Sequence, residues 1–134
     1  MKFTIYTISE KIDKFYLEAI KEYEKRLSRY CTVKLVHLKR EDQLEKKLNN
    51  NSYRLHLINN TEHSISSEEL ASKINGLGVS GISDISIIIG SVTAPCDSTL
   101  TLSPMDMDSG LKTTILFEQL YRAFRIINNH PYHK

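Results

Sequence analysis

The sequence has little of what would indicate a secreted, disulfide-stabilised or membrane-spanning protein. Only two of its 134 residues are cysteines, and Cys31 and Cys96 have neither metal-ligand spacing nor the pattern of a disulfide framework. No apolar run approaches the length that crosses a bilayer, and the N-terminal residues lack the apolar core of a signal peptide. These absences favour a reducing, cytoplasmic setting.

Several catalytic and nucleotide-binding motifs are missing as well. The sequence contains no GxGxxG fingerprint and no P-loop, so binding of nucleotide phosphates is not indicated. It also lacks the GxSxG and Cys–His signatures of hydrolases. His130 and His133 are three residues apart, but no carboxylate or cysteine lies close to them in sequence, so no metal site is predicted.

What remains is the composition of an ordinary globular protein, with 40% hydrophobic and 25% charged residues. The length fits one domain spanning residues 1–134, without repeats or a linker. The net charge of +2 is unevenly placed, since no basic residue lies between Lys73 and Lys112. This distribution permits an RNA partner without arguing strongly for one.

Hydrophobic patterning predicts strands that alternate with helices. We expect strands at residues 2–8, 31–38, 53–58, 82–90 and 100–103, and helices at 11–30, 41–49, 66–75 and 111–128. The run ISDISIIIG at 82–90 is typical of a strand buried on both faces. Ser66 and Glu69 have the spacing of a capping box, and Gly76 and Gly78 are expected to end the helix that it opens.

This alternation predicts an α/β fold with a mostly parallel sheet and helices on both faces. In such sheets ligands bind beyond the carboxyl ends of the strands. Leu57, Gly90 and residues 100–105 are therefore expected on the ligand side. A glycine at the end of a strand lets a ligand approach the backbone, although such a residue more often only forms a turn.

The C-terminal segment NNHPYHK is unusual for a disordered tail. Pro131 fixes its own φ and restricts His130, so that two imidazoles and the phenol of Tyr132 lie on a stiff segment. Such a segment can present acid–base and hydrogen-bonding groups to a ligand. The alternative is a merely soluble tail, which Pro131 and Tyr132 disfavour because they form disordered chain poorly.

The predicted final helix carries more apolar side chains than one stripe against a sheet needs, namely Leu116, Phe117, Leu120, Tyr121 and Phe124. We expect this surface to contact a second copy of the chain. Arg122 and Arg125 flank it, either as a solvated face or within reach of a phosphate.

Together these segments resemble a known family. The C-terminal FEQLYRAFRIINNHPYHK is similar to the closing segment of the ribosomal large-subunit (23S rRNA) pseudouridine N3-methyltransferases, small members of the SPOUT, or trefoil-knot, class. KFYLEAIKEYEKRLSRY resembles their first helix, and SSEELASKI and ISIIIG stand where their third helix and buried strand would be. The likeness covers nearly the whole chain, and LYRAF…NHPYHK is its most specific part.

The resemblance implies a C-terminal trefoil knot, a homodimer, S-adenosylmethionine as methyl donor, and an active site assembled at the dimer interface. The family's donor site lies among three loops, which correspond here to Leu57 or its neighbour Ile58, to Gly90, and to Leu100, Thr101, Leu102, Ser103, Pro104 and Met105. The implied substrate is a pseudouridine in a stem-loop of 23S ribosomal RNA, within assembled ribosomes.

The tail suits this chemistry, because methylation at N3 of a pseudouridine requires loss of the imide proton. A histidine titrates near neutral pH and can act as the base. Tyr132 and His133 are the first candidates for substrate positioning and proton handling, with His130 shaping the turn. Arg122 and Lys134 would contact phosphates or orient the base.

Two segments depart from the family pattern, one after the buried strand and one at the start of the last helix. The family's double glycine corresponds to Gly90-Ser91, and its Pro-His and arginine before the last helix correspond to Asp108-Ser109 and Thr113. These departures leave two alternatives open. One is a divergent paralogue that keeps the dimer and the RNA-facing tail with weak or no methyl transfer. The other is a knotted methyltransferase with another RNA substrate.

Overall fold

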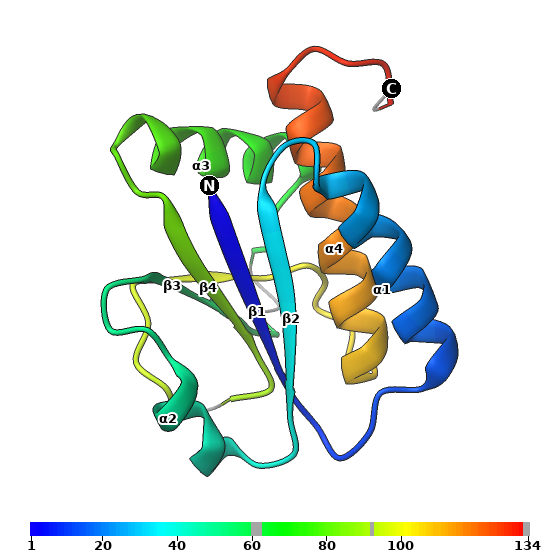
Figure 1. Ribbon diagram of the computed structural model, residues 1–134, viewed down its shortest axis with the longest axis vertical. Helices are drawn as coiled ribbons and strands as arrows, with labels where there is room; N and C mark the ends of the chain where they lie inside the picture. Colours follow the sequence, from blue (N-terminus) through cyan, green and yellow to red (C-terminus); the bar gives the residue numbers. More distant parts are fainter. Residues whose placement is uncertain (60–62, 92, 133–134) are drawn as a thin grey trace.

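The computed structural model describes residues 1–59, 63–91 and 93–132. Its elements, in chain order, are β1 (Lys2–Ile8), α1 (Lys14–Leu27), β2 (Thr32–Leu38), the 3-10 helix η1 (Glu41–Gln43), α2 (Leu44–Lys47), β3 (Tyr53–Leu57), α3 (Ser67–Val79), β4 (Asp84–Ile89), β5 (Ser98–Leu100) and α4 (Ser109–Ile127) (Figure 1). The order predicted from the sequence is confirmed. Strand β5 begins two residues before its predicted start and ends at Leu100, and helix α3 ends four residues after its predicted end.

The strands form a five-stranded sheet in the order β2-β1-β4-β3-β5, and all of the described pairings are parallel. The prediction of an α/β fold with a parallel sheet is therefore confirmed. Leu57 is in register with both Ile89 and Leu100. The carboxyl ends of β3, β4 and β5 consequently lie at one edge of the sheet, which we call the strand-end edge.

Helices cover both faces of the sheet, as predicted, but unequally. The main hydrophobic core lies between one face and helices α1, α3 and α4, while a smaller cluster on the other face packs against α2. Strand β4 contributes to both, with Ile87 and Ile89 in the main core and Ile88 in the smaller cluster. The prediction of a strand buried on both faces is confirmed.

The expectation that the apolar side chains of the final helix are exposed is wrong for four of the five residues. Leu116, Phe117 and Leu120 are fully buried within the chain, and Phe124 is nearly so. The reason is that α4 packs against α1 and α3 as well as against the sheet, so three neighbours cover its apolar side chains. Among the described phenylalanines and tyrosines, Phe15 on α1 is the exposed one.

Helix α3 begins as predicted and ends later than predicted. Ser66 Oγ accepts from the Glu69 amide at 3.1 Å, and the Ser66 amide donates to Glu69 Oε1 at 3.0 Å, which completes the capping box. Gly76 and Gly78 do not end the helix. Gly81, with φ +86°, does so, because a left-handed residue lets the next amides bond back to the last helical carbonyls. Among the described helices none is long and apolar enough to cross a membrane.

Candidate active-site segments

Two of the segments predicted to bind the donor are joined by backbone hydrogen bonds at the strand-end edge. The Ile58 amide donates to the Leu100 carbonyl, and the Ile65 amide donates to the Thr101 carbonyl, each at 2.8 Å. The segment that leaves β5 therefore lies between the two ends of the loop that connects β3 with α3. This arrangement keeps Leu57 and Leu100 buried side by side.

Gly90 follows β4 at the same edge and is required by the backbone itself. Its φ is +95°, and a Cβ atom placed there would lie 2.6 Å from the carbonyl oxygen of Ile8. Any other residue would be strained and would collide with the end of β1. The buried Ser91 then accepts a hydrogen bond from the Ala94 amide at 3.1 Å, which tightens the loop after β4.

The third predicted segment passes from the interior to the surface. Thr101 is buried, Leu102 and Ser103 are half-buried, and Pro104 and Met105 are exposed. Beyond them, Asn59 Nδ2 donates to Asp106 Oδ1 at 3.3 Å and so connects the loops after β3 and β5. The structure thus places the predicted donor residues at one edge of the sheet.

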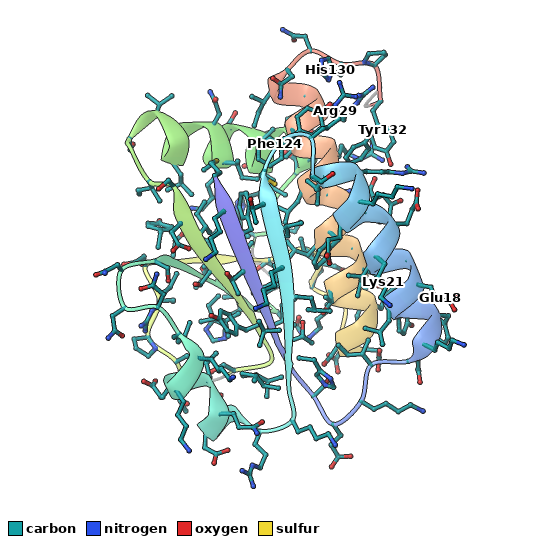
Figure 2. The ribbon with its side chains drawn as sticks, viewed as in Figure 1. Glu18, Lys21, Arg29, Phe124, His130 and Tyr132 are labelled. Carbon is teal, nitrogen blue, oxygen red and sulfur yellow. The ribbon has the colours of Figure 1, made fainter. Side chains whose placement is uncertain are left out.

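The C-terminal segment lies at the opposite end of α4, as Figure 2 shows for His130 and Tyr132. The 19 residues of α4 span about 28 Å at about 1.5 Å per residue. Within one chain, the tail and the strand-end edge therefore do not meet. His133 and Lys134 lie outside the described residues.

Tyr132 folds back onto α4. Its hydroxyl donates to Glu118 Oε1 at 3.2 Å, its ring meets Tyr121 edge-on at 4.9 Å, and the guanidinium of Arg122 lies over it at 4.9 Å. Burial, together with a hydrogen bond to Tyr23 and the charge of Glu118, raises the pKa of Tyr132 to about 12. The phenol is therefore neutral at physiological pH and suited to donate a hydrogen bond.

Two residues of this region, Tyr30 and Glu118, were not identified from the sequence, and Arg125 was identified only as a solvated or phosphate-contacting residue. Tyr30 and Arg125 contact His130, but Tyr30 is separated from the tail by about a hundred residues, and no sequence signal joins them. Glu118 accepts from Arg122 at 2.7 Å and from Tyr132. The i,i+4 spacing of Glu118 and Arg122 could have identified this pair.

The remaining described histidines are not among the predicted site residues. His56 is buried on β3, and its Nε2 has no partner among the described residues. His37 is exposed and contacts the Ser9 carbonyl at 2.8 Å, and His63 is exposed near Glu69. No group of three potential metal ligands occurs within the part of the chain that the structure describes.

Comparison with known proteins shows to which family the chain belongs. A family model described as "Predicted SPOUT methyltransferase" matches residues 1–133. The chain is 46% identical, over its full length and theirs, to "Ribosomal RNA large subunit methyltransferase H 1" of Thermoanaerobacter sp. (strain X514) and to "Ribosomal RNA large subunit methyltransferase H 2" of Thermoanaerobacter pseudethanolicus. It is 35% identical over 161 aligned positions to "Putative ribosomal RNA large subunit methyltransferase H" of Methanococcus maripaludis, again with both chains fully covered. The chain belongs to the SPOUT methyltransferase family.

Proposed function

We propose that the protein transfers a methyl group from S-adenosylmethionine to N3 of a pseudouridine in the 23S RNA of the large ribosomal subunit. The observation that carries this proposal is the 46% identity, over every residue of both chains, to proteins named as ribosomal RNA large subunit methyltransferases. The parallel sheet supports it, because its strand-end edge is where such folds bind small molecules.

The residues at the strand-end edge fit this donor. Gly90 presents backbone without a side chain, Leu102 and Met105 add apolar surface, and Thr101 and Ser103 add hydroxyl groups. This is the mixture of apolar walls and few polar groups that small-molecule sites use. When bound, S-adenosylmethionine would supply an electrophilic methyl group on a positively charged sulfur. The nearby carboxylate of Asp106 would favour that charge.

The tail would handle the RNA base. Tyr132, whose phenol stays neutral, would donate a hydrogen bond that orients the base, and His133 would accept the imide proton. His130 would hold the turn that presents them. Arg122, stacked on the Tyr132 ring, and Lys134 would contact phosphates or orient the base.

A dimer would unite the two halves of the site. Since α4 separates the tail from the strand-end edge by about 28 Å, a second copy would have to deliver its own tail to that edge. We therefore propose a homodimer of 1–134 domains that acts on ribosomes in the cytoplasm. We also propose that the C-terminal half forms a trefoil knot. The hydrogen bonds on both sides of Leu100–Thr101 support such threading through the loop between β3 and α3.

The test is methyl transfer from radiolabelled S-adenosylmethionine to ribosomes and isolated large subunits from cells that lack this activity. Mass spectrometry of digested 23S RNA should then detect one N3-methylpseudouridine. Tyr132→Phe, which keeps the ring but loses the hydroxyl, should lower the rate without weakening donor binding measured by calorimetry. Donor binding without any methylated 23S RNA would overturn this substrate. Ribosome association without donor binding would instead support the binding-only paralogue.

A further inference from the structure

The C-terminal segment is held by hydrogen bonds from a distant part of the chain. The Tyr30 hydroxyl lies 2.6 Å from His130 Nδ1, and Arg125 Nη1 donates to that same hydroxyl at 3.1 Å. Arg125 Nη2 also donates to the carbonyl of Pro131 at 3.1 Å. We call Tyr30, Arg125 and His130 the tail latch. It ties the residues after α4 to the connection between α1 and β2.

The latch fixes the direction of its hydrogen bonds. Because Arg125 can only donate, the Tyr30 oxygen is its acceptor, and the hydroxyl proton of Tyr30 is left to point to His130 Nδ1. In the neutral imidazole, Nδ1 is then the acceptor and Nε2 carries the proton. The latch therefore sets both the orientation and the tautomer of the His130 ring.

Two features that do not depend on the Tyr30 hydroxyl keep Tyr30 and His130 in place. The Tyr30 ring stacks on Phe124 at 5.7 Å with an interplanar angle of 10°, and Figure 2 shows Phe124 close to the tail. Asn129, with φ 56°, reverses the chain between α4 and His130. Removing the hydroxyl alone would thus leave the aromatic packing in place while removing the 2.6 Å contact to His130 Nδ1, so that only the longer contact of Arg125 Nη1 with this nitrogen, at 3.4 Å, remains.

Arg125 is placed at a cost in free energy. Its Nε is buried and has no hydrogen-bond partner among the described residues, although its two terminal nitrogens are both used. A buried donor without a partner is unfavourable, and such groups in folded proteins call for a reason other than stability. Holding the tail in one orientation is a function that this geometry performs.

We propose that Tyr30 and Arg125 are positioning residues that orient the C-terminal segment for methyl transfer. The proposal rests on the proposed function. Neither side chain would touch the RNA base or the donor, so each would act only by holding the C-terminal segment. Tyr132 lies only two residues beyond His130, so the latch restricts where its phenol can lie. Small misplacements of reacting groups lower enzymatic rates steeply.

The test compares Tyr30→Phe with the matched control Tyr53→Phe. Tyr53 is a half-buried tyrosine on β3 whose hydroxyl has no hydrogen bond among the described residues. For Y30F we expect kcat on ribosomes to fall about tenfold, because less accurate positioning of the reacting groups would raise the activation free energy by about 1.4 kcal/mol. The KM for S-adenosylmethionine should stay unchanged. The ¹⁵N signals of His130 should move from those of a single tautomer towards a mixture, whereas Y53F should match the original protein throughout.

A second variant, Arg125→Lys, keeps the charge but loses the two-pronged donor, so it should shift the same signals and lower kcat at least as much. Circular dichroism establishes that each variant is folded. Unchanged His130 signals in Y30F would overturn the latch, and unchanged kcat with altered signals would overturn its positioning role. If the original protein itself methylates no 23S RNA, the proposed function fails. An active original protein with an equally active Y30F removes only the positioning proposal.

Discussion

Replacement of Gly90 by alanine tests whether the strand-end edge depends on a backbone conformation that only glycine adopts. At φ +95° an alanine would be strained, and its Cβ would lie 2.6 Å from the Ile8 carbonyl oxygen. The left-handed conformation costs about 1–2 kcal/mol, and forcing an atom into a packed site costs about 1–3 kcal/mol more. We therefore expect Gly90→Ala to lower the free energy of unfolding by about 2–5 kcal/mol.

Substitutions at two other glycines separate the cost of the backbone conformation from the cost of the collision. Gly81 has φ +86°, but a Cβ there would meet no atom within 4 Å, so Gly81→Ala should cost only the conformational part, about 1–2 kcal/mol. Gly76 lies inside α3 with equally open surroundings. Because alanine is the better helix former, Gly76→Ala should raise the free energy of unfolding by about 0.5–1 kcal/mol.

Urea denaturation followed by circular dichroism measures the series. All proteins must be compared at one concentration, because association of folded chains makes stability concentration-dependent. Calorimetry with S-adenosylmethionine adds a second measurement, and Gly90→Ala should also weaken donor binding since the ends of β1 and β4 must move apart. If Gly90→Ala is no more destabilising than Gly81→Ala, the collision with Ile8 is not real and the reasoning is refuted.

Four further predictions concern the capping box, the thiols and the buried hydroxyls. Ser66→Ala should lower the free energy of unfolding by about 1 kcal/mol in urea denaturation. Hydrogen bonds from the Ser66 backbone and side chain lower the pKa of Glu69, so its contribution is present above its unfolded-state pKa and is lost as pH falls through the folded-state pKa. Glu69→Gln should therefore destabilise the protein at neutral pH and have little effect below that range; equal effects at both would contradict this. Burial raises the pKa of Cys31 to about 11, whereas Cys96 is exposed, so a thiol reagent should label Cys96 first and Cys31 only on unfolding, as read by mass spectrometry. Thr113→Val should cost about 1–3 kcal/mol, because it leaves the buried Thr7 hydroxyl without the partner it has at 2.8 Å.

The sequence predicted the elements whose signals are local. The β-branched run of β4 and the Ser66–Glu69 spacing each depend on residues that are close in the chain, and both are confirmed. The end of α3 was misjudged because glycines signal a helix end only where the backbone is left-handed. Gly76 and Gly78 remain helical, while Gly81 has the positive φ.

Features that depend on contacts between distant parts of the chain could not be predicted from the sequence. The apolar width of α4 was interpreted as a partner surface because nothing in the sequence shows that α1 and α3 both pack against it. In the same way, no local pattern indicates that the Tyr30 hydroxyl meets His130, which is about a hundred residues away in the chain. The strand-end edge was predictable since parallel strands bring their carboxyl ends together whatever the loops contain.

The length of α4 has a consequence for how activity depends on protein concentration. If each catalytic centre takes its tail from a second copy, the two halves of the site in an isolated molecule cannot combine. Dilution that dissociates the dimer would then abolish methyl transfer. In a mixed pair, one chain lacking the tail and one damaged at the strand-end edge would together rebuild a single working centre. Two individually dead proteins would then restore part of the methylation when mixed.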